Sequence, residues 1–373
     1  MEANKIYDCA IIGGGLAGLC LSIQLAQKGF LVVLMEKNSY PFHKVCGEYI
    51  SLESWNFLSQ LGIPLAEMNL PIIKKLQVTA ENGFIINADL DLGGFGISRF
   101  TLDEKLAQCA RQAGVAVLEN TTAKDVTLEN ETYTITTNHY QIKSKLAFGS
   151  FGKINPSFIS DKNPAKKGAY IGVKYHIKTD FPNNIIALHN FKDGYCGISK
   201  VDKETYCLCY LTTTKNLREN NNSISEMEKN VLKKNPYLKK IFSESTFLFD
   251  KPLAISQISF KKKKTFSNNL ILLGDSAGAI APLCGNGMSM AMRASQFLAN
   301  YVIDYLENKI SKNELLNNYE KLWNANFALR INTGFYLQKL LGKNVLTFIS
   351  LKALNAFPSL FQRLIGLTHG KPF

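Results

Sequence analysis

Hydrophobic and polar positions follow two different periods along the chain, and the first forty residues show both. Short apolar runs at residues 7–12 and 30–35 predict two buried strands. Between them, residues 19–28 carry apolar positions at helical spacing, and Gly29 ends that pattern. A strand, a glycine turn, a helix and a second strand within about thirty residues have the size of one βαβ unit.

The middle of the chain changes repeatedly between strand and helix patterns. Residues 72–87 alternate apolar and polar positions and predict β-structure, whereas residues 101–113 return to helical spacing. Two further strands are predicted at 115–118 and 132–137, and a long β-rich stretch follows from 170 to 214.

The last part of the chain is predominantly helical. A charged helix is predicted over residues 223–242, a strand over 270–273 and another helix over 287–305. The C-terminal region beyond them keeps a helical pattern.

This order of segments predicts an α/β fold, α+β overall, in which a Rossmann-like domain is assembled from separated pieces of the chain. The β-rich segments are then insertions that form a second, sheet-based substrate domain, and helices form the C-terminus. The first domain takes residues 1–75, 98–165 and 255–310, the second takes 76–97 and 166–254, and the helical region takes 311–373.

Three glycines follow the first strand with the spacing of a dinucleotide-binding turn. Gly13 permits the tight turn, Gly15 lets the backbone approach a pyrophosphate, and Gly18 allows close packing of helix on strand. The helix N-terminus presents free N–H groups and a positive dipole end to the phosphates. Glu36, at the end of the second strand, can accept hydrogen bonds from both ribose hydroxyls of an adenosine. The expected contacts also include Ala17 and Lys37.

A second motif begins where the strand at 270–273 ends in Gly-Asp, before a Pro-x-x-Gly-x-Gly turn and a helix. It resembles the second FAD fingerprint of the p-hydroxybenzoate hydroxylase superfamily. The resemblance implies FAD as the cofactor, with Asp275 on the ribityl chain and the helix N-terminus at the pyrimidine edge of the flavin. Reduced flavin carries negative charge near N1, which a helix N-terminus stabilises. The implied contacts are Gly274, Asp275, Pro282, Gly285, Asn286, Gly287 and Met288.

Residues 41–48 form a third motif, which resembles the Cys-Gly segment of the geranylgeranyl reductase branch of that superfamily. The resemblance implies that Lys44, Cys46 and Gly47 lie near the flavin and the substrate pocket. A strand that ends in Arg99, before a helix that begins with an acidic residue, resembles the same branch and implies that Arg99 lies near the FAD. The resemblance covers most of residues 5–310, and we can place no part of the segment beyond it.

Two departures from the superfamily narrow the expected chemistry. Hydroxylases carry an Asp-Gly motif where this chain has residues 148–153 without an Asp, which puts a hydroxylase-type interaction with NADPH in doubt. Flavin-dependent halogenases carry two tryptophans in the segment that corresponds to residues 194–199, where this chain has none. Trp55 and Trp323 lie elsewhere.

The leading interpretation is an FAD-dependent oxidoreductase that hydrogenates or dehydrogenates a carbon–carbon bond of a largely apolar substrate. An aromatic monooxygenase is the alternative. A halogenase is disfavoured by the missing tryptophans, and a non-catalytic flavoprotein would not need the inserted sheet. Cys46 is the candidate catalytic residue, facing substrate or flavin, against the alternative of an inert thiol. Tyr195 and Tyr210 are candidate substrate contacts, against ordinary packing in a sheet.

Composition and charge argue against several other classes of protein, including disulfide-rich, metal-binding, membrane-spanning and nucleic-acid-binding ones. The eight cysteines show no CxxC pair and no zinc spacing, so we expect neither a disulfide framework nor a metal site. No apolar run approaches the roughly 20 residues that span a bilayer, and no signal-peptide pattern is present, so we expect a cytoplasmic protein. The net charge of +13 fits a solvated basic surface and leaves open a peripheral contact with an anionic membrane. No nucleic-acid-binding motif is visible, and the expected partners are an apolar or aromatic small-molecule substrate and an electron donor, NAD(P)H or a reduced protein.

Overall fold

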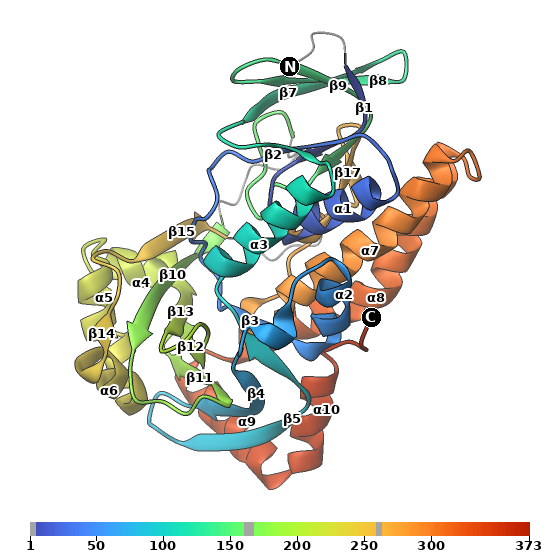
Figure 1. Ribbon diagram of the computed structural model, residues 1–373. Coiled ribbons are helices and arrows are strands. Elements are labelled where there is room, and N and C mark those ends of the chain that lie inside the picture. Colours follow the sequence, from blue (N-terminus) through green and yellow to red (C-terminus); the bar gives the residue numbers. More distant parts are fainter. Residues whose placement is uncertain (1–4, 160–167, 259–262) are drawn as a thin grey trace.

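Two β-sheets with helices packed on them form the body of the protein (Figure 1). The computed structural model describes residues 5–159, 168–258 and 263–373. In Figure 1 the first sheet lies at the top, the second lies at the lower left, and the C-terminal helices run along the right side and below.

The first sheet has a parallel core in the order β17-β9-β1-β2-β6. All four residues of β2 are buried, as expected for a parallel strand with both faces covered. Helices α1, α3 and α7 contribute to the same hydrophobic core as these strands. The elements are β1 (Ile6–Ile12), α1 (Leu16–Gln27), β2 (Val32–Met35), α3 (Arg99–Gln112), β6 (Ala116–Leu118), β7 (Ala123–Glu129), β8 (Thr132–Thr137), β9 (Gln141–Gly149), β16 (Phe266–Ser267), β17 (Leu270–Leu272) and α7 (Gly287–Leu306).

The second sheet has the order β14-β10-β13-β12-β11-β4-β5-β3, and β15 also pairs with β10. It is antiparallel except for the parallel pair β11 and β4. Its strands are β3 (Tyr49–Ser51), β4 (Ile72–Thr79), β5 (Ile85–Gly96), β10 (Gly168–Lys178), β11 (Ile185–Phe191), β12 (Gly194–Lys200), β13 (Tyr206–Thr213), β14 (Thr246–Phe247) and β15 (Leu253–Gln257).

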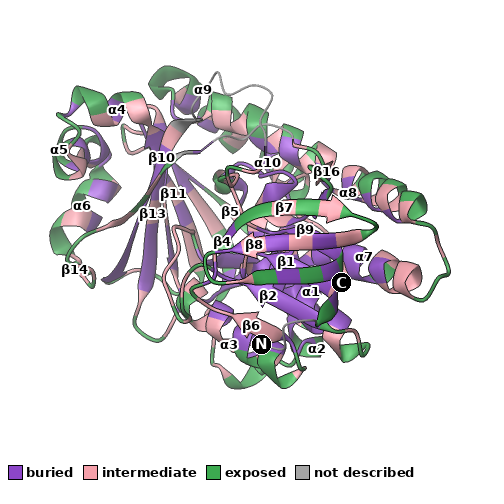
Figure 2. Cartoon of the chain, turned by 90° about the horizontal axis from the view of Figure 1, so that it is seen from above, coloured by how far each residue is buried: buried purple, intermediate pink, exposed green. Residues whose placement is uncertain are grey.

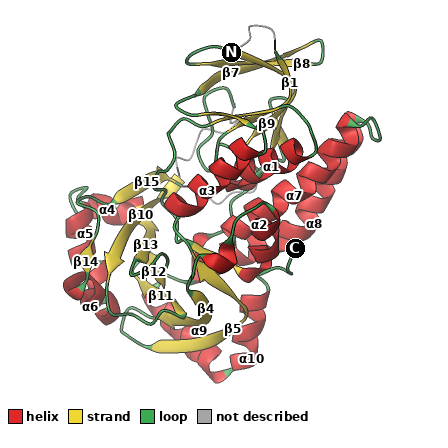
Figure 3. Ribbon diagram, in the orientation of Figure 1, coloured by secondary structure: helices red, strands yellow, loops and turns green. Residues whose placement is uncertain are grey.

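Helices cover this second sheet in two places (Figure 3). Apolar residues of α5 and α6, including Met227 and Leu238, pack on β10 and β13. Leu351 and Phe361, from the C-terminal helices, pack on Val78 and Ile86. The short helices on the α5–α6 side are α4 (Thr214–Glu219), α5 (Ile224–Asn230) and α6 (Pro236–Glu244). A further short helix, α2 (Trp55–Gln60), packs in the core of the first sheet.

The C-terminal region consists of α8 (Lys312–Leu340), α9 (Asn344–Ala356) and α10 (Pro358–Gly366). A capping box of Ser311 and Glu314 starts α8, and Trp323 and Phe327 anchor it in the core of the first sheet. In the part of the chain that the structure describes, no helix has the length and apolar character needed to cross a bilayer.

The predicted α/β fold with an added sheet and a helical C-terminus is confirmed. Two predicted elements are wrong in detail. Arg99, expected at the end of a strand, is the first residue of α3, and among the described residues no acidic one lies in the first turn of that helix. The helix expected over 223–242 is broken between α5 and α6. Pro236 cannot donate a backbone hydrogen bond, and Asn235 caps α6 by accepting from the Tyr237 amide. The expected domain boundary at 75/76 falls inside β4, and the one at 165/166 lies outside the described residues.

Candidate active site

The glycine turn joins β1 to α1, and its glycines serve different purposes. Gly13 has a φ of +108°, and a Cβ added there would lie 2.3 Å from the Ser150 carbonyl oxygen. A Cβ at Gly18 would lie 2.2 Å from the Gly13 carbonyl oxygen, whereas one at Gly15 would meet no described atom within 4 Å. The fold therefore requires Gly13 and Gly18, while Gly15 faces open space through which a ligand can approach the backbone.

The first turn of α1 leaves its backbone amides available. In the described ranges, no side chain caps this N-terminus and no acidic residue lies in its first turn. An uncapped helix start is a favourable place for a phosphate. Ala17 is buried in the same turn, 3.0 Å from where a Cβ of Gly274 would lie, so the two glycine motifs meet here.

Glu36 directly follows β2 and lies beside the glycine turn. Its Oε2 accepts a hydrogen bond from the Gly14 amide at 3.0 Å, and its Oε1 accepts from the backbone and side-chain nitrogens of Asn38. The Tyr40 hydroxyl, which the sequence did not single out, donates to the Gly14 carbonyl at 2.6 Å. Lys37 is exposed next to Glu36. These contacts hold the carboxylate at the turn, where we expect the ribose.

Asp275 follows β17 in a short 3-10 helix, η4 (Gly274–Ser276). Its carboxylate is partly exposed and lies 3.9 Å from the Lys153 ammonium. Its backbone oxygen accepts a hydrogen bond from Lys263 at 3.3 Å. The side chain is thus accessible to a polar ligand on a surface where positive charge gathers.

The turn before α7 prepares a second uncapped helix start. Gly285 has a φ of +65°, and a Cβ there would lie 3.0 Å from the Tyr49 ring. The Asn286 amide group donates to the Thr368 carbonyl at 2.7 Å, which ties the turn to the C-terminus. Within the residues described, no side chain caps α7 and no acidic residue lies in its first turn. Negative charge on a ligand would be stabilised here.

Asp103 holds one end of residues 44–48, which we call the Cys46 loop. Its two oxygens bind the Arg99 guanidinium at 2.7 Å each, and one of them also binds the Lys44 ammonium at 3.0 Å. Burial raises the pKa of Asp103, but the Arg99 and Lys44 charges outweigh burial and hold the pKa below its usual value. The guanidinium of Arg99, expected beside the FAD, is therefore committed to Asp103.

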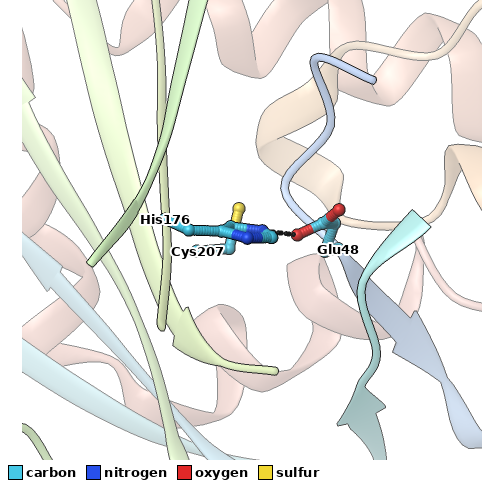
Figure 4. Close-up of side chains that lie close together, drawn as sticks. All are labelled: Glu48, His176 and Cys207. Atoms are coloured by element: carbon cyan, nitrogen blue, oxygen red, sulfur yellow. Dashed lines mark hydrogen bonds and ion pairs between the residues drawn. The ribbon is translucent and has the colours of Figure 1, made fainter. Parts of the chain in front are cut away.

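Glu48 fastens the other end of the Cys46 loop to the second sheet (Figure 4). Its Oε1 accepts from the Lys174 ammonium at 2.5 Å and from the Arg99 amide at 2.7 Å, and its Oε2 accepts from His176 Nε2 at 2.6 Å. Burial raises the pKa of Glu48, but the His176 hydrogen bond and the Lys174 charge bring it below its usual value. An ionised carboxylate can only accept, so His176 carries a proton on Nε2.

Glu48, His176 and Cys207 also have ligand atoms within 4.8 Å of one another, a spacing that would suit a metal ion. Two features of the described residues argue against one. The Lys174 ammonium already occupies Glu48 Oε1. Burial, with the Glu48 charge, raises the pKa of the Cys207 thiol well above its usual value, so the thiolate that a metal needs is disfavoured. The arrangement favours an ion-pair network.

Cys46 lies where three elements meet. Its carbonyl oxygen accepts a hydrogen bond from the Cys207 thiol on β13 at 3.2 Å, and its sulfur lies 3.6 Å from the Met288 sulfur on α7. A Cβ added at the neighbouring Gly47 would meet no described atom within 4 Å. The loop thus lies between the second sheet and the start of α7, with an open side at Gly47.

Tyr195 and Tyr210, both expected to contact substrate, point to opposite faces of the second sheet. Tyr195 pairs with Leu211 and packs with it near Ala279, on the side of the turn before α7. Tyr210 packs with the α5–α6 side, where its hydroxyl donates to Glu228 at 2.8 Å. Side chains alternate faces along a strand, so Tyr210 lies on the face opposite to Tyr195, and its role as a substrate contact stays a prediction.

These features fit FAD. The open side of Gly15 and the uncapped start of α1 suit a pyrophosphate, and Glu36 lies where a ribose would be held. The accessible Asp275 and the uncapped start of α7 suit a ribityl chain and an electron-rich ring edge.

Comparison with known proteins agrees with this fit. The family described as "FAD binding domain" matches residues 7–144. The chain carries an FAD binding domain of the p-hydroxybenzoate hydroxylase superfamily. FAD is therefore the cofactor of this flavoprotein, which is an FAD-dependent oxidoreductase.

Two relatives align with most of this flavoprotein. Conditioned medium factor receptor 1 of Dictyostelium discoideum is 25% identical over 370 residues, covering 88% of this chain and 69% of that protein. Digeranylgeranylglycerophospholipid reductase of Methanococcus vannielii is 25% identical over 333 residues, covering 86% and 83%.

Solved structures share its fold. A flavin-dependent brominase superposes with a TM-score of 0.80 at 17% identity, covering 98% of this chain and 93% of that one. A geranylgeranyl bacteriochlorophyll reductase-like protein from Thermoplasma acidophilum superposes with a TM-score of 0.74 at 18% identity, covering 97% and 99%.

Proposed function

We propose that this flavoprotein hydrogenates or dehydrogenates a carbon–carbon bond of a largely apolar substrate, which binds between the Cys46 loop and the second sheet. The observation that carries this proposal is an apolar wall between the second sheet and the turn before α7. It is built from Tyr195, Leu211 and Ile258, with Ala279 of that turn, which form a buried cluster without a charged side chain. An apolar wall with few polar groups is typical of a site for an apolar ligand.

The Tyr195 hydroxyl is the polar group of this wall. It is buried, its oxygen lies near the Leu283 backbone N–H, and no acceptor for its proton lies among the described residues. Burial raises its pKa well above the usual value, so the hydroxyl keeps its proton. In this proposal Tyr195 donates a hydrogen bond to a polar atom of the substrate and orients it. FAD, when bound, supplies or accepts the electrons of the reaction.

The substrate class is supported by the relatives. Proteins named digeranylgeranylglycerophospholipid reductase align with most of the chain, and their name indicates an isoprenoid lipid with several double bonds. We extend this to the present chain as an isoprenoid lipid substrate, with electrons from NAD(P)H or a reduced protein. A cytoplasmic enzyme of this kind reaches such a lipid through a peripheral contact with a membrane.

The test is anaerobic reduction of the FAD-loaded protein with dithionite in the presence of a polyunsaturated isoprenoid lipid. The expected product has gained one H₂ for each reduced bond, as measured by mass spectrometry. Parallel reactions with NAD(P)H and oxygen on phenols, with and without bromide, test the alternatives. Hydroxylated product would instead support a monooxygenase, and brominated product a halogenase. An isoprenoid lipid that gains no hydrogen with the reduced protein, and loses none with the oxidised protein, would overturn the proposal.

A further inference from the structure

Exposed apolar side chains concentrate at one place in the protein. Nine of the fifteen large apolar side chains that are exposed in the described residues lie between residues 329 and 360. The densest group occupies the last two turns of α8 and the first two turns of α9. We call it the junction surface, and it consists of Phe335, Tyr336, Leu340, Val345, Leu346 and Ile349.

The helical periods explain why these side chains share a surface. Tyr336 and Leu340 are four residues apart on α8, and Val345 and Ile349 are four apart on α9, so each pair lies on one helix face. The Thr347 hydroxyl donates to the Leu340 carbonyl at 3.4 Å, which places the start of α9 beside the end of α8. The opposite face of α9 is buried through Leu351. Exposed residues of α8 and α9 appear green in Figure 2.

The side chains of the junction surface are much more exposed than apolar residues at the edge of a hydrophobic core. Tyr336 is 69% exposed and Val345 is 70% exposed. Beside them, Tyr336, Leu340 and Leu364 line a shallow groove of about 440 Å³ between α8 and α10. Exposed apolar patches of this kind mark surfaces that bind another apolar body.

The charge of the C-terminal region indicates what kind of partner this apolar surface binds. From residue 321 to 373 the chain has seven Lys or Arg residues and no Asp or Glu. Three of these, Lys339, Lys343 and Lys352, are exposed on α8, on α9 and in the turn between them. Asp193, whose amide donates to the Gly342 carbonyl at 2.6 Å, lies beside this turn together with the exposed Lys192. An apolar surface rimmed by lysines, with no acidic residue on its own helices, matches the interface of an anionic bilayer.

The junction surface is also close to the proposed active site. A Cβ at Gly334 on α8 would lie 2.9 Å from the Cys284 sulfur, so this helix packs directly on the turn before α7. Tyr336 is two residues further and points to the other side of the helix, because successive helical residues turn by about 100°. One helix diameter, about 10 Å, therefore separates the junction surface from that turn.

We propose that the junction surface docks this protein on the surface of an anionic phospholipid bilayer. The apolar side chains enter the boundary between headgroups and acyl chains, while the three lysines contact lipid phosphates. The protein does not span the bilayer. This docking is independent of which bond the enzyme acts on, because it depends only on the surface of α8 and α9.

The test is flotation of the FAD-loaded protein with vesicles of phosphatidylcholine, with or without phosphatidylglycerol. We expect binding to the anionic vesicles, weaker binding to the neutral ones, and release by high salt. The triple variant Lys339→Gln/Lys343→Gln/Lys352→Gln should lower the partition coefficient on the order of a hundredfold. The double variant Val345→Ser/Ile349→Ser should lower it about tenfold or more.

Matched controls separate the surface from bulk charge and hydrophobicity. Lys28→Gln/Lys74→Gln/Lys124→Gln makes the same charge change at exposed lysines elsewhere, and Leu31→Ser/Leu248→Ser removes exposed leucines elsewhere. Both should bind as the wild type does, and flavin absorbance verifies that every variant is folded. Wild-type protein that ignores anionic vesicles, or junction variants that bind like their controls, would overturn the proposal. The proposal would also be overturned if the wild type formed a dimer, did not bind vesicles, and became a monomer in the variant Val345→Ser/Ile349→Ser.

Discussion

The Glu48 carboxylate and the His176 ring lie 2.6 Å apart, although 128 residues separate them in the chain. Glu48 has a φ of 56°, in the left-handed region that an L-residue rarely adopts, and its side chain is fully buried. The contact joins the Cys46 loop to β10, with Lys174 on the other carboxylate oxygen. The position of the loop beside α7 therefore depends on the buried negative charge of Glu48, together with that of Asp103 at the other end of the loop.

Replacing Glu48 with Gln keeps the shape of the side chain and removes this charge. Lys174 then remains buried without its counter-charge, and breaking a buried pair costs about 3–5 kcal/mol of unfolding free energy. Urea unfolding measures the loss. The control is Glu204→Gln, because that carboxylate is exposed and lies 3.9 Å from Lys200. It should change the unfolding free energy by less than about 0.5 kcal/mol, and an equally small effect of Glu48→Gln would contradict the network.

His189 predicts how stability depends on pH. Its ring is fully buried, and burial lowers its pKa to about 3. The unfolded chain takes up this proton near the ordinary pKa of about 6.5, whereas the folded protein does not. The neutral, buried His189 therefore contributes its full share of the unfolding free energy above about pH 6.5, and that share is lost as the pH falls toward 3. Between pH 7 and pH 5 we expect the unfolding free energy to decrease by about 2 kcal/mol from this cause.

Comparison of two histidine variants isolates this effect. His189→Asn keeps a polar group near the Thr79 hydroxyl, which lies 3.0 Å from His189 Nδ1. Its unfolding free energy, measured between pH 7 and pH 5, should fall less steeply than that of the wild type. His139→Asn, at an exposed position, should keep the wild-type slope. Equal slopes in all three proteins would mean that His189 is protonated in the fold.

The local parts of the fold could be predicted because the signal lies within short segments. The strand, glycine turn and helix around Gly13 are specified by neighbours in sequence, and the structure has them as β1 and α1. The order of the second sheet could not be predicted, because β4 joins β11, more than a hundred residues away, through contacts that leave no local pattern. Tyr49–Ser51 belongs to that sheet through its pairing with β5, which is also distant in sequence.

In the candidate site, too, the residues of local motifs could be predicted and the contacts between distant segments could not. The sequence selected Lys44, Cys46 and Arg99 from local resemblance, but it missed Glu48, Lys174 and His176, whose roles arise only when distant segments meet. The sequence also could not tell that Tyr195 and Tyr210 lie on opposite faces, because the face of a strand residue depends on pairing register. The register places Tyr210 opposite Cys196, and Tyr195 opposite Leu211.

Two glycines of the first motif should respond differently to substitution. Gly15→Val adds a side chain on the open side, where a Cβ meets no described atom within 4 Å, so the protein should fold and lose FAD. Gly13→Ala should instead destabilise the fold, because its Cβ would lie 2.3 Å from the Ser150 oxygen. Flavin absorbance and thermal unfolding distinguish the two. The wild type should purify yellow, and a colourless protein that also takes up no added FAD would refute the cofactor site.

Asp275→Ala tests the second motif. The carboxylate is partly exposed and has only a 3.9 Å contact with Lys153, so its loss should leave the melting temperature nearly unchanged. A hydrogen bond from the ribityl chain to a charged group contributes about 1.5–3 kcal/mol, so FAD affinity should fall about tenfold to a hundredfold. Asp250→Ala, at an exposed position elsewhere, is the control. Unchanged FAD retention of Asp275→Ala after dialysis would remove Asp275 from the cofactor site.

Cys46→Ser tests where the substrate lies. The Cys46 sulfur is 3.6 Å from the Met288 sulfur, and the loop backbone is held by Cys207 and Glu48 whichever side chain stands at position 46. The substitution removes little volume, so FAD content and the melting temperature should remain those of the wild type. If the loop borders the substrate, the change from a soft sulfur to a hydroxyl should alter turnover several-fold or change the face of the double bond that receives hydrogen.

The measurement uses deuterium from labelled reductant or solvent, with its position in the product read by NMR. Cys109→Ser is the matched control, because Cys109 lies on α3, where its sulfur is 3.5 Å from the Cβ position of Gly62. That variant should match the wild type in both rate and stereochemistry. If Cys46→Ser also shows the wild-type rate and the wild-type stereochemistry, the substrate lies away from the Cys46 loop. The apolar wall around Tyr195 would then have to bind it from another side.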